Sequence, residues 1–165
     1  MPTWYYAKVT VHVLAAMVWL GGMLFLGLVG APALRRIEPA PLRQRLFQEL
    51  GVRFRAVGWW CIAVLVVTGG MNLWFRGWLR GASPALLDGA FWHTGTGHAL
   101  AAKLVCVVVM VATSAVHDFV IGPGAGRATP GSERALLLRR RAALLARMNA
   151  LVGVVLVAAA VRLAR

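Results

Sequence analysis

Acidic side chains are scarce in this 165-residue sequence, which has five Asp and Glu residues against 18 Lys and Arg. The resulting net charge of +13 is typical of nucleic-acid-binding proteins when the basic residues form a patch on a soluble domain. Here the basic residues fall between long apolar runs, and 60% of all residues are hydrophobic. The composition therefore predicts a membrane protein whose partner is the lipid bilayer, and it argues against nucleic acid.

Cysteine is scarce as well. Cys61 and Cys106 each lie inside an apolar run and lack C-x-x-C spacing, which argues against a disulfide scaffold and a zinc knuckle. Together with Met17, Met23 and Met110, they are expected at different depths of the membrane. That spread does not favour a relay of sulfur ligands.

Four segments are long and apolar enough to cross a bilayer core of about 30 Å, which takes roughly 20 residues per helix. They are approximately residues 5–29, 56–74, 99–119 and 142–161. We predict an all-α integral membrane four-helix bundle that forms a single transmembrane domain over residues 1–165.

Two features between the spans give further expectations. Pro41 is expected to open a short helix that lies on the membrane surface or under the bundle, with apolar residues recurring every four positions at Leu42, Leu46, Leu50 and Phe54. The Pro- and Gly-rich stretch 121–131 predicts a loop.

Lys and Arg are unevenly distributed around these spans. Segments 30–55 and 120–147 carry six each, and the other side carries only Lys8, Arg76, Arg80, Arg162 and Arg165. Basic loops face the cytoplasm, so we expect both termini and the loop 76–97 outside. The predicted location is the inner (plasma) membrane, crossed several times.

Three spans place ionisable or metal-ligating side chains in one outer layer. From a helical rise of about 1.5 Å per residue, His12 lies about 10 Å inside the outer boundary, Lys103 about 9 Å, and Met71 about 5 Å. His98 lies close to the boundary, and His117 falls at the opposite end. Ionisable residues within a span are functional candidates because they are costly to insert.

Two cofactor chemistries suit this layer. One is haem b, bound through His12, with Lys103, His98 or Met71 as the second ligand. His98 and Lys103 lie about 140° apart around their helix and are not expected to share one iron. The other is copper, because imidazole and thioether groups suit Cu(I). The haem propionates are expected to pair with an arginine at the outer boundary, Arg76 or Arg80.

The sequence resembles a known family at three places. These are AKVTVHVLAAMVWLGGMLFL (7–26), LFQELGVRFRAVGWWCIAVLVVTGGMNLW (46–74) and HALAAKLVCVVV (98–109). The first has a histidine and a W-x-G-G motif, the second an R-F entry and a T-G turn, and the third a lysine-leucine pair. They are similar to the copper-resistance protein D (CopD) family and the related HemJ-type protoporphyrinogen oxidases.

The resemblance implies a four-helix membrane protein. Its HemJ side implies haem b at His12 and Lys103, with Arg53 or Arg55 as a matching arginine, and its CopD side implies copper handling. The chain departs from the oxidase pattern in a longer outer loop and in the spacing from Lys103 to His117. It also lacks the extramembrane segment rich in methionine and histidine that would support copper scavenging.

We therefore predict a b-type-haem-binding membrane protein with a redox or electron-transfer role. A haem-dependent oxidoreductase is the enzyme class considered, although the departures above weigh against porphyrinogen oxidation. The alternatives are a CopD-like copper transport or resistance protein and a structural subunit of a membrane complex. A redox partner protein and a second copy of the chain are the protein partners considered.

The distribution of basic residues generates a topology prediction. A reporter protein fused after Arg165 should be active outside the cytoplasm, because both arginine-rich loops are expected inside. Reporter activity in the cytoplasm instead would reverse the assigned depths of His12 and Lys103.

Overall fold

The computed structural model describes residues 3–80, 84–129 and 132–164, and every long element in these ranges is helical. The predicted all-α class is confirmed. The helices are α1 (Thr3–Phe25), α2 (Ala31–Arg35), α3 (Ala40–Phe75), α4 (Gly95–Ala115), α5 (Gly122–Arg127) and α6 (Glu133–Ala164). Two π-helical turns, Leu26–Gly30 and Val116–Ile121, join α1 to α2 and α4 to α5.

Four helical stretches are long and apolar enough to cross a membrane, as predicted. They are Thr3–Arg35, Ala40–Phe75, Gly95–Arg127 and Glu133–Arg162, each of 30 residues or more. At about 1.5 Å per residue each exceeds 40 Å, so the helices extend beyond a hydrocarbon core of about 30 Å. The chain is therefore a multi-pass helical membrane protein.

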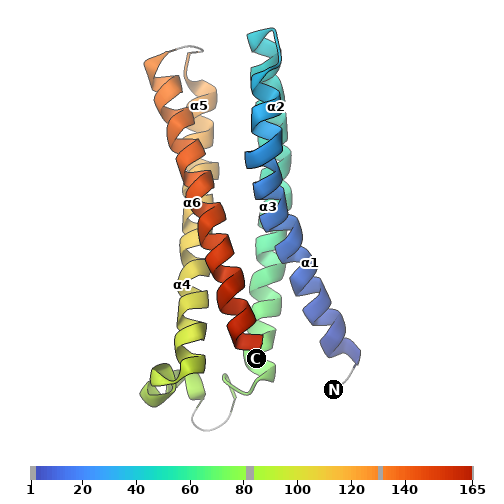
Figure 1. Ribbon diagram of the computed structural model, residues 1–165, viewed down its shortest axis with the longest axis vertical. Coiled ribbons are helices and arrows are strands. Elements are labelled where there is room, and N and C mark those ends of the chain that lie inside the picture. The colour runs from blue at the N-terminus through green and yellow to red at the C-terminus, as the bar shows by residue number, and fades with distance from the viewer. Residues whose placement is uncertain (1–2, 81–83, 130–131, 165) are drawn as a thin grey trace.

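The helices run alternately up and down, so that both termini lie at the same end of the bundle (Figure 1). We call it the terminal end; it also carries the 3₁₀ turns Ala85–Leu87 and Gly89–His93. The opposite end, with α2 and α5, is called the basic end. Helix α1 packs against α3 and α4 against α6, which gives two antiparallel pairs.

A small apolar cluster connects the two pairs. Trp19 of α1, Ile62 of α3 and Met110 of α4 are buried against one another, and Val152 and Leu156 of α6 pack against them. All four long helices thus contribute to one contact region.

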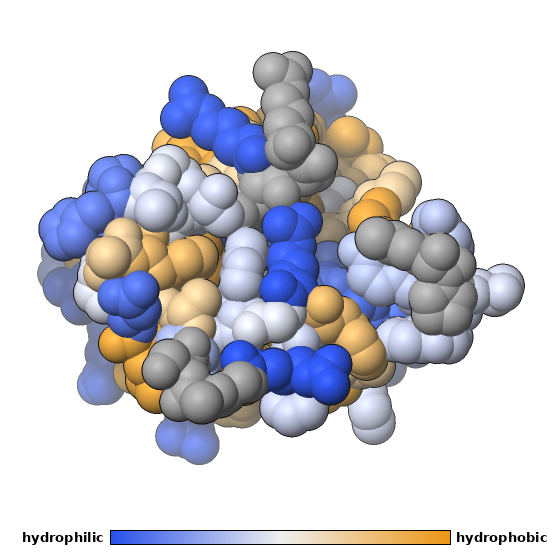
Figure 2. Space-filling model, turned by 90° about the horizontal axis from the view of Figure 1, so that it is seen from below, coloured by the Kyte–Doolittle hydropathy of each residue, from blue (hydrophilic) through white to orange (hydrophobic). Residues whose placement is uncertain are grey.

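Large apolar side chains cover the outside of the bundle. Leu28, Trp60, Val108 and Leu151 are examples from the four stretches, and each is well exposed. Water would be a poor solvent for such a surface, and bilayer hydrocarbon is a suitable one. Seen along the bundle from the terminal end, hydrophilic side chains reach the middle of the end face between apolar ones (Figure 2).

Two expectations for the loops were wrong. Pro41 does not open a separate surface helix, because α3 is continuous from Ala40 to Phe75 with a proline in its first turn, where the missing N–H has no intrahelical partner to lose. Residues Gly122–Arg127 of the predicted loop form α5, which likewise has a proline in its first turn. Residues 130 and 131 of that predicted loop lie outside the described part.

A polar group inside the bundle joins three helices. Asn149 of α6 is only 5% exposed. Its Oδ1 lies 2.7 Å from the Thr113 hydroxyl, and its Nδ2 donates to the Ser114 hydroxyl at 3.0 Å and to the Met23 sulfur at 3.5 Å. These bonds satisfy an amide that would otherwise be unpaired in hydrocarbon, and they fix α6 against α4 and α1.

The start of α4 is held by a close backbone approach at Gly97. Thr94 caps the helix by accepting a hydrogen bond from the Gly97 N–H at 3.0 Å. Gly97 is buried, and a Cβ atom there would collide with the backbone carbonyl of Phe91. The 3₁₀ turn Gly89–His93 can therefore pack against α4, the helix that carries Lys103, only because residue 97 has no side chain.

Gly97→Ala should lower the stability of the folded protein by about 1–3 kcal/mol, because a backbone carbonyl cannot rotate away as a side chain can. Gly95→Ala is the matched control in the same helical turn, since nothing lies within 4 Å of a Cβ there. It should leave stability unchanged or raise it slightly, because alanine favours helix. Thermal unfolding of both variants in one detergent measures the difference, and equal melting temperatures would contradict the packing described.

Candidate functional site

His12 of α1 faces α3, where its ring contacts the backbone turn around Thr68. Its Nδ1 lies 2.7 Å from the Thr68 hydroxyl. Gly69 is the next residue after Thr68. A Cβ atom added to Gly69 would lie 3.9 Å from Cε1 of the His12 ring. The histidine therefore occupies a position between α1 and α3 where small side chains leave space for an imidazole.

The hydroxyl of Thr68 determines which nitrogen of His12 carries the proton. Thr68 donates its single hydrogen to the carbonyl of Val64, one turn earlier, at 2.6 Å. The hydroxyl can then only accept from His12, so Nδ1 carries the proton and donates. In the neutral ring this leaves the lone pair on Nε2, which has no hydrogen-bond partner in the described part of the chain.

Three cationic side chains lie around this histidine. Lys8, one turn before His12, is 7% exposed; its Nζ lies 4.6 Å from the ring centre of Tyr5 and 4.8 Å from that of Phe75. This ammonium has no hydrogen-bond partner among residues 3–80, 84–129 and 132–162. Lys103 of α4 is close enough to act electrostatically on His12, and Arg76 acts likewise on Lys103.

We call Lys8, His12, Thr68 and Lys103 the His12 layer. Three helices contribute to it, α1, α3 and α4. No carboxylate of the described residues is among the charged groups that act on His12. The layer thus combines one imidazole with one hydroxyl and two lysine side chains.

The other predicted site residues lie nearer the surface. Met71, three residues after Thr68 on α3, is 37% exposed, and His98 is exposed in the first turn of α4. At the terminal end the guanidinium groups of Arg76 and Arg80 lie over the indole rings of Trp78 and Trp74, at 5.1 Å and 5.4 Å. Their roles as ligands or propionate partners stay predictions.

Three sulfur-bearing side chains meet at the buried apolar cluster, and the expected spread in depth of all five stays a prediction. Met110 belongs to the buried cluster with Trp19 and Ile62, and Met23 and Cys61 pack against that cluster. The three sulfur-bearing residues come from three different helices. Sequence spacing could not show this, because it does not reveal how the helices are shifted against one another.

A second polar group lies at the π-helical turn near the basic end. Asp118 accepts from the Trp59 indole N–H at 3.0 Å and pairs with Nδ1 of His117 at 2.9 Å. Its backbone carbonyl accepts from Arg55 at 3.1 Å. His117 thus belongs to a group separate from the His12 layer, as expected from its depth.

Sequence reasoning missed the part played by Thr68. A usable signal was present, since Thr68 stands six residues before Trp74 and therefore about 9 Å deep, level with His12.

Among the described residues, no group of three or more His, Cys, Asp and Glu side chains is placed to hold a metal ion. A metal here would need methionine, lysine or an external ligand beside histidine.

The fold defines a multi-pass helical membrane protein with buried polar groups between its helices. Residues 48–163 match the family described as copper resistance protein D (CopD), which covers most of the chain. An uncharacterized protein of Aquifex aeolicus (strain VF5) is 35% identical over 115 residues, or 69% of this chain and 68% of that protein. No solved structure matches.

The chain therefore belongs to the CopD family, which confirms the resemblance drawn from the motifs. The matched region includes Thr68 and Lys103 but begins after α1. His12 is consequently assigned from its geometry in this chain and not from the family match.

Proposed function

We propose that this protein handles copper within the membrane, with His12 as a ligand near the terminal end. The observation that carries the proposal is the hydrogen bond from Nδ1 of His12 to Thr68, because it leaves Nε2 as the coordinating nitrogen. Metal-binding histidines nearly always donate their other ring N–H to a neighbouring acceptor, which fixes the ring's orientation and tautomer. The description of the family supports copper as the ion.

The sulfur-bearing residues support the same ion. Met23, Cys61 and Met110 lie deeper along the bundle than His12, around the cluster that connects the helix pairs. Thioether and thiol groups are soft ligands that prefer Cu(I) to harder cations. Imidazole at one level and sulfur at the next provide ligands along the interior of the bundle for a copper ion that is the protein's cargo.

Haem b is a second candidate, favoured by one specific observation. Lys8 and Lys103 place positive charge near His12 without a carboxylate among the groups that act on it. A free cation is repelled by such surroundings, whereas the propionates of a haem are attracted. The buried ammonium of Lys8, which lacks a hydrogen-bond partner in the described ranges, fits an anionic group. Haem iron held by His12 would supply one-electron redox chemistry.

His12→Ala should abolish high-affinity metal binding, because it removes the one ligand nitrogen that the structure orients. Thr68→Val should weaken binding by about 10- to 100-fold, since the ring loses the acceptor that fixes its tautomer. Thr68→Ser is the matched control: it keeps the hydroxyl and should stay within a few-fold of the wild type. Competition with a coloured Cu(I) chelator measures the three affinities in detergent.

Metal analysis and a visible spectrum of the same purified sample separate the candidates. Copper without a Soret band supports the first proposal. A Soret band that is lost in His12→Ala, together with the absence of bound copper, would support haem and overturn the copper proposal. Neither copper nor haem in the wild type, or equal binding by Thr68→Val and Thr68→Ser, would overturn the assigned role of His12 and leave a structural role in a membrane complex.

A further inference from the structure

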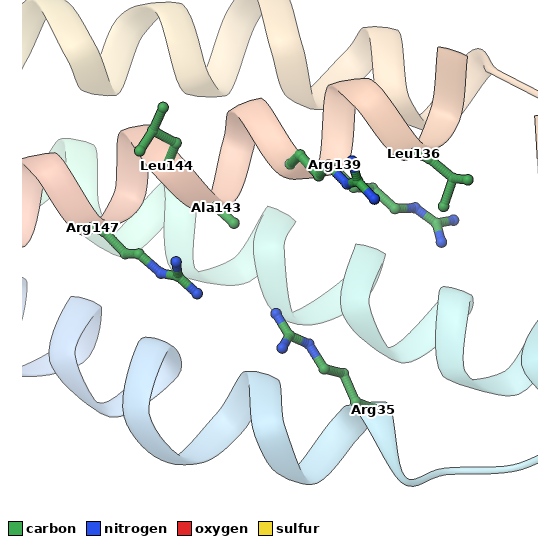
Figure 3. Close-up of a pocket in the computed structure, with 7 residues that line it drawn as sticks. Arg35, Leu136, Arg139, Ala143, Leu144 and Arg147 are labelled. Carbon is green, nitrogen blue, oxygen red and sulfur yellow. The ribbon is translucent and has the colours of Figure 1, made fainter. Parts of the chain in front are cut away.

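A cleft of about 410 Å³ opens at the basic end, between α2 and the first half of α6. Its polar lining is made of four arginines, Arg35 of α2 and Arg139, Arg140 and Arg147 of α6. Figure 3 shows that Arg35 and Arg147 extend from opposite sides into the same space. This cleft is separate from the His12 layer, which lies toward the other end of the bundle.

The periodicity of α6 explains why these side chains share one face. Each lining position on α6 from Leu136 to Arg147 has another lining position three or four residues away, which places them on one side of a helix. Ala135 and Asn149, which lie off this face, are buried. The arginine face is therefore left for a partner outside the packed core.

The cleft has an uncompensated positive charge. No salt bridge among the described residues involves any of its four arginines. Arg139 donates to the amide oxygen of Gln44 at 3.3 Å, which ties one guanidinium to the start of α3. Four guanidinium groups that converge without a carboxylate repel one another, and an anion bound between them would remove that repulsion.

The chemistry of the lining indicates which anion fits. Guanidinium groups bind phosphate oxygens in pairs of parallel hydrogen bonds. The arginines on the α6 side of the cleft run from Arg139 to Arg147, a rise of about 12 Å, which exceeds the length of a single phosphate group. Two linked phosphates would contact both Arg147 and the pair Arg139 and Arg140.

Apolar side chains beside the arginines favour a lipid over a soluble phosphate. Leu136 and Leu144 line the same cleft and are 49% and 57% exposed. Helix α6 continues from there into its apolar span, so a headgroup in the cleft would have its acyl chains beside the exposed leucines. Basic pockets between membrane helices are a recognised form of headgroup site.

We propose that the cleft between α2 and α6 binds the headgroup of one phospholipid that carries two phosphates, such as cardiolipin. Arg35 and Arg147 hold it from opposite sides, Arg139 and Arg140 extend the site along α6, and Leu136 and Leu144 contact its acyl chains. The site does not depend on copper or haem, so its test is independent of the proposed function.

Native mass spectrometry of delipidated protein in detergent, titrated with cardiolipin, tests the site. The cleft variant is Arg35→Gln with Arg140→Gln and Arg147→Gln. The matched control is Arg36→Gln with Arg134→Gln and Arg141→Gln, which removes the same charge at the same end but outside the lining. The cleft variant should bind cardiolipin on the order of a hundredfold more weakly, because each arginine contributes roughly a factor of five, while the control should stay within a few-fold of the wild type.

Three further arms make the result decisive. Phosphatidylglycerol, with one phosphate, should bind more weakly than cardiolipin, and phosphatidylcholine should not saturate the site. Inorganic pyrophosphate should not displace the lipid at equal concentration; saturable pyrophosphate binding that displaces cardiolipin would assign the cleft to a soluble phosphate. Equal losses of cardiolipin affinity in the cleft and control variants would show that total charge, and not the cleft, determines binding. That result would overturn the proposal. If the cleft variant does not purify, Arg35→Gln alone should show a loss of roughly fivefold.

Discussion

The absence of water from the bilayer interior is the constraint on which the rest of this structure depends. A polar group there must find its partner within the protein, because no solvent can supply one. Backbone groups meet this requirement by forming helices. Side chains meet it by bonding across helices, as Asn149 does with α4 and α1, and as His12 does with Thr68. The same bonds that satisfy these groups also fix how the helices are placed.

In the His12 layer, the hydrogen bonds that satisfy Thr68 also determine which nitrogen of His12 carries the proton. Thr68 needs an acceptor for its hydrogen and finds the Val64 carbonyl in its own helix. The proton on the imidazole is thereby assigned to Nδ1 and the lone pair to Nε2. Lys8, unlike Thr68, is not satisfied within the described part of the chain. Its ammonium is buried against aromatic rings and has no hydrogen-bond partner there. The layer thus holds one polar group that is satisfied within the bundle and one that is not.

The two ends of the bundle differ in how they hold charge. At the terminal end, Arg76 and Arg80 lie over indole rings, and the lysines lie inside the bundle near His12. At the basic end, arginines converge in an open cleft that borders exposed leucines. Scarcity of acidic residues links the two, because five carboxylates cannot neutralise 18 basic side chains. Most of the positive charge therefore has no carboxylate partner within the chain.

The sequence by itself determined the helical class and the four spans, because these follow from the pattern of hydropathy along the chain. It also carried the motifs that place the chain in its family. Only the tertiary structure decided that Thr68 meets His12, that Met23, Cys61 and Met110 pack at one apolar cluster, and that Arg35 faces Arg147. Each of these contacts joins different helices, and their relative shift and rotation depend on packing at residues such as Gly97 and Asn149. Periodicity within one helix holds no information about that packing.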